Sequence, residues 1–225
     1  MIVPVRYWQV NTPEDMSEDW LNRWNEGRTG WHEVAGNESL KRYWPDIGEP
    51  GSVLVPLCGK TPDLLWLAKR GHDVVGVEFS RIAIEGFFEE QGLMYEREVA
   101  GPFQRYRARD HALTLYCGDY FDFESRPFDA LYDRAALVAL DKSQRPAYVA
   151  HTKKLLKRDA LRFIITVEYE QDVVSGPPFS VTAEELTQYW NDLARVREKD
   201  DIDNCPPKFC HAGLQEITEV VWMSR

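Results

Sequence analysis

The sequence lacks long apolar runs and has little positive charge. No apolar stretch approaches the roughly 20 residues that a helix needs to cross a bilayer. The first residues, MIVPVRYWQVNTPEDMSEDW, have no basic region followed by an apolar one, which argues against a secretory signal. A formal net charge of −10 disfavours nucleic acid as a partner, because phosphate binding requires a basic surface. We therefore expect a cytoplasmic protein that binds neither membrane nor nucleic acid and, without an obvious interface helix, a monomer.

Cysteine is also scarce, with four residues in 225. Cys58 and Cys117 each end an apolar run, where buried thiols are common. Cys205, Cys210 and His211 form a C-x4-C-H cluster, but a metal site would require a fourth ligand and a second close pair. We therefore expect no metal site and interpret the cluster as a loop with incidental thiols.

The remaining composition is ordinary for a globular protein, with 44% hydrophobic and 28% charged residues. The length suits a single domain over residues 1–225. Apolar runs predict strands at 53–57, 73–78, 112–117, 128–132, 161–168, 194–202 and 214–222, and helical patterns lie at 61–70, 80–91, 145–156 and 182–191. This alternation indicates an α/β fold with a mostly parallel sheet covered by helices on both faces. Only a loop joins the last two strands, so we expect a hairpin and an antiparallel last strand.

Two segments lie outside this predicted sheet. Residues 15–43 precede the first strand and are rich in tryptophan, within an N-terminal segment 1–50 that is set apart from a core at 51–225. Residues 93–110 lengthen the connection before the third strand and contain RYRARD, which alternates in charge. Two interpretations of 93–110 remain open at this point: a solvated loop, or a lid over the binding site.

The ends of the first two strands carry the first candidate site residues. Open α/β sheets bind ligands at the carboxyl ends of their strands. After the first strand, PLCGK has one glycine, Gly59, where a dinucleotide loop has G-x-G-x-x-G. This loop suits a pyrophosphate poorly, although the glycine lets the backbone approach a small ligand closely. Glu78 ends the second strand, where a carboxylate accepts hydrogen bonds from ribose hydroxyls; the alternative is a surface carboxylate.

The next two strand ends also carry polar residues. Asp119 and Tyr120 follow the third strand, where a carboxylate can accept from an adenine amine and an aromatic ring can stack on the base. An ordinary turn is the alternative. Asp133 and Arg134 end the fourth strand. Arg134 either belongs to a surface ion pair or faces the cleft and attracts an anionic substrate.

A site that suits a nucleoside but not a pyrophosphate suggests S-adenosylmethionine as the cofactor. Its sulfonium is a cation, and the faces of tryptophan rings attract such cations by about 0.5–2 kcal/mol. Trp20, Trp24 and Trp31 could supply that face. Trp20 and Trp24 are four residues apart and share one face of a helix, which plain core packing would also explain.

These motifs resemble the thiopurine S-methyltransferase family. The matching stretches are WLNRWNEGRTGWH at 20–32, VLVPLCGKTPDLLWLA at 53–68, RGHDVVGVEFS at 70–80, YDRAALVAL at 132–140 and SGPPFSV at 175–181. The resemblance implies a Rossmann-like class I methyltransferase fold with a seven-stranded sheet, and aromatic or heterocyclic thiols as substrates. It places Trp24, Leu57, Glu78 and Arg134 at cofactor-binding positions, Asp119 and Tyr120 on the adenine side, Arg134 also beside the substrate, and 20–31 in a cofactor cover. DDIDNCPPKFCHAG at 200–213 departs from the family pattern.

The implied reaction is an in-line displacement in which a thiolate attacks the methyl carbon of the sulfonium. The donor is already activated, so the protein mainly supplies proximity and alignment. Arg134 could favour the anion, and His32 is a candidate proton acceptor or a structural hydrogen-bonding residue. Three alternatives remain: a methyltransferase for halide, thiocyanate, sulfide or metalloid ions, a nicotinamide-dependent oxidoreductase, and a non-catalytic binder of S-adenosylmethionine.

Overall fold

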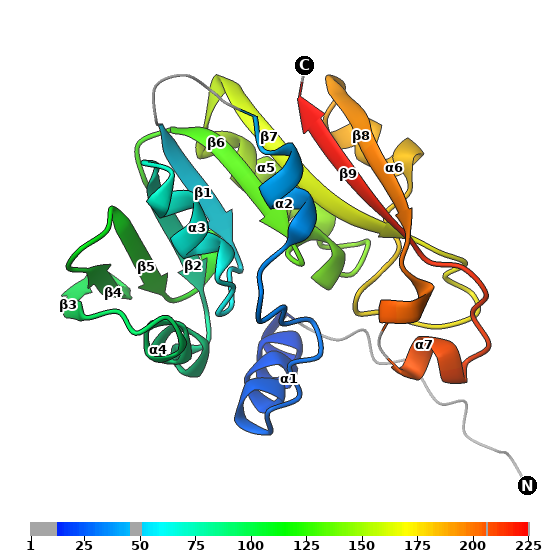
Figure 1. Cartoon of the computed structure of the whole chain (residues 1–225), viewed down its shortest axis with the longest axis horizontal. Helices are drawn as coiled ribbons and strands as arrows, with labels where there is room; N and C mark the ends of the chain where they lie inside the picture. Colours follow the sequence, from blue (N-terminus) through cyan, green and yellow to red (C-terminus); the bar gives the residue numbers. More distant parts are fainter. Residues whose placement is uncertain (1–12, 46–50, 206, 225) are drawn as a thin grey trace, which may run out of the picture.

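The computed structural model describes residues 13–45, 51–205 and 207–224, and in this part of the chain the strands form one mixed sheet of nine. Their order across the sheet is β3-β4-β5-β2-β1-β6-β7-β9-β8 (Figure 1). The strands are β1 Ser52–Pro56, β2 Asp73–Glu78, β3 Tyr95–Ala100, β4 Phe103–Ala108, β5 Leu113–Cys117, β6 Phe128–Arg134, β7 Leu156–Glu168, β8 Leu193–Asp200 and β9 Thr218–Ser224. The helices are α1 Pro13–Asn25, α2 Glu38–Tyr43, α3 Asp63–Lys69, α4 Arg81–Glu90, α5 Arg145–Lys154, α6 Ala183–Tyr189 and α7 Pro207–His211, with short 3-10 turns η1 Tyr120–Asp122, η2 Leu137–Ala139 and η3 Ile202–Asn204.

The centre of the sheet is parallel, as predicted, but the prediction of seven strands is wrong. Strands β5, β2, β1, β6 and β7 pair in parallel, and β9 runs antiparallel to both β7 and β8. Residues 93–110 supply the extra strands, because β3 and β4 form a hairpin that pairs antiparallel with β5. This segment is therefore neither a solvated loop nor a lid. Its outer strand was overlooked because the residues inside β3 are exposed, which leaves no apolar alternation to recognise.

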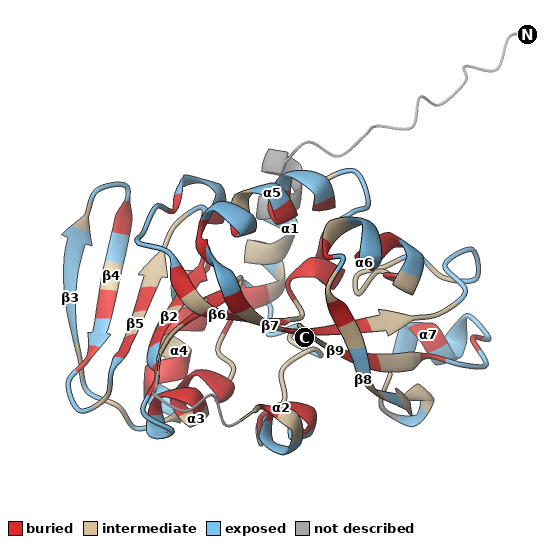
Figure 2. Ribbon diagram, turned by 90° about the horizontal axis from the view of Figure 1, so that it is seen from above, coloured by how far each residue is buried: buried red, intermediate tan, exposed pale blue. Residues whose placement is uncertain are grey.

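Helices cover both faces of the sheet, as expected from the strand–helix alternation (Figure 2). Buried residues of α2, α3 and α4 pack with one set of strand side chains, which includes Val53, Val74 and Phe163. Buried residues of α5 and α6 pack with the opposite set, which includes Leu54, Val77 and Ile164. Neighbouring strand residues thus point to opposite faces, and both faces are apolar because both are buried.

The helix ends follow local capping rules with one departure. At the start of α4, Ser80 Oγ accepts from the Ala83 backbone N–H at 3.3 Å, and at the start of α6, Thr182 Oγ1 accepts from the Glu185 backbone N–H at 3.2 Å. The spacing of Thr182 and Glu185 suits a capping box, but the Glu185 carboxylate instead pairs with buried Arg145 at 2.8 Å. Gly71 ends the α3 turn with a φ of +93°, a conformation that favours glycine.

Helices α1 and α7 lie beyond the edge at which the parallel strands end (Figure 1). Helix α1 belongs to the N-terminal segment expected over 1–50, of which 1–12 and 46–50 lie outside the described residues. No helix in the described ranges is long and apolar enough to cross a membrane. The two helices therefore border the edge of the sheet where a ligand is expected.

Candidate active site

A cavity of about 900 Å³ lies at the carboxyl ends of the parallel strands. Its walls come from the N-terminal segment, the loops after β1, β2, β5 and β6, and the C-terminal strands β8 and β9. All nine residues selected from the sequence line it: Trp20, Trp24, Trp31, Leu57, Gly59, Glu78, Asp119, Tyr120 and Arg134. The strand-end rule therefore located the cavity, whereas the role of each residue in it stays a prediction.

The loop after β1 is joined to the end of β2 by the Glu78 carboxylate. The backbone N–H of Gly59 donates to Glu78 Oε2, and that of Ser80 donates to Oε1, each at 2.8 Å. Burial raises the pKa of Glu78, and the backbone N–H groups of Ser80 and Gly59 partly oppose this by stabilising the charged form. The carboxylate is thus held rigidly at the cavity wall, with its acceptor capacity not exhausted by these two bonds.

Two residues of this loop have left-handed backbone conformations. Gly59 has a φ of +54° and Leu57 a φ of +45°. A Cβ atom at position 59 would lie 3.2 Å from Cζ2 of Trp24, so the glycine also permits close packing of the N-terminal segment. Strain at a non-glycine residue such as Leu57 persists only where the surroundings enforce it, which is common in binding sites.

The three tryptophans form one aromatic cluster against the loop. Trp31 packs edge-to-face with Trp20 at 4.9 Å and with Trp24 at 5.5 Å between ring centroids. Arg23 lies over the Trp20 ring at 5.1 Å, which is a cation–π distance. Trp20 and Trp24 share a face of α1, as their spacing predicted. Both rings therefore pack against Trp31 as well as lining the cavity.

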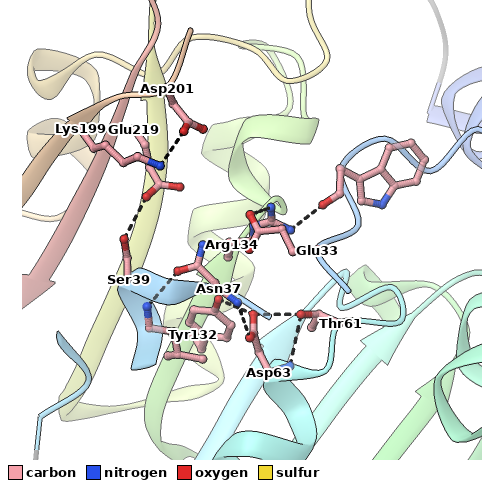
Figure 3. A network of polar contacts seen from close by, with 12 residues as sticks. Glu33, Asn37, Ser39, Thr61, Asp63, Tyr132, Arg134, Lys199, Asp201 and Glu219 are labelled. Atoms are coloured by element: carbon pink, nitrogen blue, oxygen red, sulfur yellow. Dashed lines mark hydrogen bonds and ion pairs between the residues drawn. The ribbon is translucent and has the colours of Figure 1, made fainter. Parts of the chain in front are cut away.

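Arg134 fixes the N-terminal segment to the end of β6. Its Nη1 donates to the Trp31 carbonyl at 2.7 Å, and its Nη2 pairs with Glu33 (Figure 3). Burial alone would lower the pKa of Arg134, but Glu33 and other acidic neighbours raise it above its usual value, so the guanidinium stays charged. The side chain lines the cavity, as expected, and it also acts as a tether that the sequence did not indicate.

A second tether runs through Asp63, the first residue of α3. Asp63 accepts from the Asn37 backbone N–H and from the Tyr132 hydroxyl, each at 2.8 Å, and from Thr61 at 2.9 Å. Figure 3 shows these residues beside Arg134 at the strand ends. The N-terminal segment is thus bonded to both β6 and the start of α3.

The loop after β5 places Asp119, Tyr120 and Phe121 in different ways. Asp119 is exposed and accepts from the Phe121 backbone N–H at 2.9 Å. Tyr120 is 2% exposed, and its hydroxyl lies 2.9 Å from Thr152 Oγ1. Phe121 also lines the cavity and is 45% exposed. Phe121 is therefore the more accessible aromatic ring, and sequence reasoning missed it because Tyr120 stands first after the predicted turn.

A sequence model of one family matches residues 16–225, and its description is Thiopurine S-methyltransferase. A thiopurine S-methyltransferase of Bordetella petrii is 40% identical over 213 residues, covering 92% of this chain and 96% of the relative. A thiopurine S-methyltransferase of Pseudomonas fluorescens is 41% identical over 216 residues, which cover 92% of this chain and 98% of the relative. The chain belongs to the thiopurine S-methyltransferase family. It is a methyltransferase whose cofactor is S-adenosylmethionine, which confirms both expectations.

More distant solved structures share the fold. A Burkholderia thailandensis 1,6-didemethyltoxoflavin-N1-methyltransferase, solved with S-adenosylhomocysteine, has a TM-score of 0.62 and 17% identity and covers 100% of this chain and 93% of its own. TehB from Haemophilus influenzae has a TM-score of 0.52 and 15% identity, and the match covers 83% of this chain and 65% of TehB. These similarities support the class I methyltransferase fold.

The wall opposite the strand ends comes from the C-terminal part of this family member. It contains residues that sequence reasoning did not select: Pro177, Pro178, Arg197, Lys199, Asp201, Cys205, Lys208, Ile217 and Glu219. Lys199 pairs with Asp201 at 2.9 Å, and Ser39 donates to Glu219 at 3.0 Å. Burial raises the pKa of Glu219. The strand-end rule for parallel sheets does not extend to β9, so no local signal marked this wall.

His32 lines the cavity near α4. Its Nε2 lies 3.4 Å from Glu90 Oε2, and Lys60 pairs with the other oxygen of Glu90 at 2.5 Å. Burial, followed by the charge of Lys60, lowers the pKa of His32, which favours the neutral ring at neutral pH. A neutral imidazole can accept a proton, although the Nε2 atom faces Glu90.

Proposed function

We propose that the protein transfers the methyl group of S-adenosylmethionine to the sulfur atom of an aromatic or heterocyclic thiol. The observation that carries this proposal is the cavity itself. Its volume of about 900 Å³ lies near the top of the roughly 300–1,000 Å³ range of small-molecule pockets. A space of this size accommodates an organic acceptor beside a nucleoside cofactor, whereas a halide or sulfide ion would require much less.

The residues of the β1 and β2 ends fit a nucleoside without a pyrophosphate. Gly59 leaves no Cβ between the loop and Trp24, and Glu78 presents a buried carboxylate to the same wall. We assign ribose binding to Glu78, because a carboxylate accepts from two vicinal hydroxyl groups and would repel a 2′-phosphate. Phe121, with Asp119 beside it, is assigned to the adenine, because an accessible ring can stack on the base.

Bound S-adenosylmethionine supplies an electrophilic methyl group on a cationic sulfur. The tryptophan cluster would surround that cation with aromatic faces and exclude water. The chain's main contribution is then to hold the acceptor sulfur in line with the methyl carbon. Aromatic thiols ionise more readily than alkyl thiols, and only the thiolate is a good nucleophile. A strong general base is therefore not required.

Arg134 is assigned the stabilisation of the acceptor thiolate. Its guanidinium carries five N–H donors, and the bonds to Trp31 and Glu33 leave others for an anion. The same residue would thus hold the N-terminal segment against the end of β6 and favour the ionised form of the acceptor.

The test is an assay for S-adenosylhomocysteine release across thiopurines, thiophenols, sulfide, halides, selenite and tellurite. We expect turnover with thiophenols and thiopurines at kcat/KM values at least tenfold above those for any inorganic acceptor. A higher kcat/KM for an inorganic ion would replace the proposed acceptor class. Cofactor binding without S-adenosylhomocysteine release in the presence of any acceptor would indicate a non-catalytic binder. Thermal unfolding provides a parallel measurement: S-adenosylhomocysteine at about 100 times its Kd should stabilise the fold by about 2.7 kcal/mol. NADH should leave the transition unchanged.

A further inference from the structure

A pair of thiols that the methyl-transfer chemistry does not use lies at the C-terminal wall of the cavity, and one of them, Cys205, lines the cavity. Cys205 follows η3, and Cys210 lies in α7. Their Sγ atoms are 3.0 Å apart. The sequence predicted a loop with incidental thiols, but the chain folds so that both thiols point to one place.

The backbone around the pair is held by packing and hydrogen bonds. Phe209, between the two cysteines, is fully buried in a small core with Leu214 and Ile217, and Cys205 packs against that core. The Cys205 N–H donates to the Ile202 carbonyl at 3.3 Å. Lys208 ties α7 to the loop after β7 through the Ser175 carbonyl at 2.9 Å. The sulfur atoms are therefore presented together by an anchored segment.

The two thiols differ in access. Cys210 is exposed, whereas Cys205 is half-buried and lines the cavity. Burial and the neighbouring Cys210 raise the pKa of Cys205 to about 11, so the Cys205 thiol is protonated at neutral pH. A reagent from solvent can reach Cys210 first and then Cys205, and a group bound to both would stand at the cavity wall.

We propose that Cys205 and Cys210 form a dithiol site that binds trivalent organic arsenicals through both sulfur atoms. Thiols are soft ligands and favour soft, thiophilic centres. An arsenic centre with one organic substituent needs two sulfur ligands. A structural zinc ion needs four ligands, and the described residues contain no group of three or more His, Cys, Asp or Glu that could hold a metal ion.

The binding step is a condensation that requires no oxidant. Phenylarsine oxide, C6H5As=O, reacts with two thiols: both S–H bonds break, two As–S bonds form, and the oxygen leaves with both protons as water. Closing the second As–S bond is intramolecular, so a paired site retains arsenic far better than separate thiols do. This difference distinguishes the pair from Cys58 and Cys117, for which the described contacts include no thiol–thiol hydrogen bond.

The experiment uses the full chain, reduced with a phosphine, desalted and incubated with phenylarsine oxide before intact-mass spectrometry. We expect one phenylarsenic group per chain that survives excess glutathione and is removed by 1,2-ethanedithiol. Cys205→Ser and Cys210→Ser should each lose the glutathione-resistant adduct. Cys117→Ser is the matched control, because it removes one thiol outside the pair, and it should retain the adduct.

Two further measurements keep the result interpretable. Circular dichroism and the Tm of each variant establish that the variants fold, and Cys210→Ser alters an exposed side chain that α7 does not need for packing. Oxidation of the parent with diamide should abolish binding, and the phosphine should restore it. The proposal is overturned if the adduct persists in both serine variants, if glutathione strips it from the parent, or if diamide leaves it unaffected. None of these readouts depends on methyl transfer.

Discussion

Gly59 and Glu78 are joined by a 2.8 Å hydrogen bond from the glycine N–H to the glutamate carboxylate. This bond spans the ends of β1 and β2, the strands at the centre of the parallel sheet. One carboxylate therefore shapes the loop that lacks the usual glycines and also faces the cavity. The conformation of this single-glycine loop is thus fixed by a hydrogen bond to a side-chain carboxylate.

Replacing Glu78 by glutamine should weaken cofactor binding. An amide nitrogen is a donor, so one of the two backbone N–H groups loses its acceptor, and the charge that favours ribose hydroxyls is removed. Hydrogen bonds to charged groups contribute about 1.5–3 kcal/mol, so we expect the Kd for S-adenosylmethionine to rise roughly tenfold to hundredfold. Isothermal titration calorimetry measures this change.

The matched control for that substitution is Glu89→Gln, which makes the same chemical change at an exposed position of α4. Its Kd should equal that of the parent. An unchanged Kd in the Glu78 variant would remove Glu78 from the cofactor site.

Replacing Gly59 by alanine should affect both stability and cofactor binding. A non-glycine residue in the left-handed region costs about 1–2 kcal/mol, and the new Cβ would press on Trp24 from 3.2 Å. Gly92→Ala is a close control, because Gly92 has a φ of +63° but no atom within 4 Å of the added Cβ. We expect both variants to lose unfolding free energy, Gly59→Ala at least as much as Gly92→Ala, but a weaker cofactor affinity only for Gly59→Ala. Equal affinities would show that the contact with Trp24 does not matter.

The centre of the sheet could be predicted because each central strand is buried on both faces. Such strands are continuous apolar runs, and their carboxyl ends must meet at one edge of the sheet. The hairpin of β3 and β4 could not be recognised in this way, because the inner residues of β3 are exposed. Its position beside β5 is set by pairing with Leu115 and Tyr116 rather than by its own composition.

The tethers of the site were also invisible to local rules. Arg134 contacts the Trp31 carbonyl across 103 residues of sequence, and Ser39 contacts Glu219 across 180. Local periodicity reports on neighbours three or four residues apart. It located the strands whose ends carry the candidate residues, but it could not show which of these residues hold the N-terminal segment in place.

The two roles assigned to Arg134 can be separated with Glu33. Glu33→Ala removes the ion pair but leaves the Arg134 bond to the Trp31 carbonyl. If Arg134 only tethers the N-terminal segment, Arg134→Ala should therefore be slower than Glu33→Ala by no more than the loss of that one bond, roughly tenfold. If the guanidinium also stabilises the thiolate, a second charged hydrogen bond of about 1.5–3 kcal/mol is lost, and Arg134→Ala should be slower than Glu33→Ala by roughly hundredfold or more. Single-turnover rates at saturating cofactor measure the difference.

Arg134→Lys provides the control for charge alone. Lysine keeps the cation but loses the planar fork that contacts Trp31 and Glu33 together. We expect its single-turnover rate to lie between those of the parent and the alanine variant. Equal rates for Arg134→Ala and Glu33→Ala would contradict the proposed effect on the acceptor.

Asp133 should make the stability of the protein depend on pH in an unusual direction. Burial raises its pKa to about 6, although the Leu137 N–H and the Tyr148 hydroxyl donate to it. The unfolded value is about 3.9, so the folded state binds the proton more tightly. The unfolding free energy that Asp133 contributes is therefore largest below about pH 4 and falls as the pH rises through 6. For a shift of this size the total change is about 3 kcal/mol.

Urea unfolding of the parent and of Asp133→Asn between pH 3 and 7 isolates this contribution. Asparagine does not titrate, so the parent should lose stability relative to the variant as the pH rises from 4 to 6. Asp129→Asn gives a contrast of opposite sign, because Lys157 and Ser52 lower the pKa of Asp129 to about 2. In that case the parent should gain stability over the variant as the pH rises from 2 to 4. A difference between the parent and Asp133→Asn that is constant from pH 4 to 6 would show that Asp133 is ionised throughout. The two hydrogen bonds would then outweigh burial.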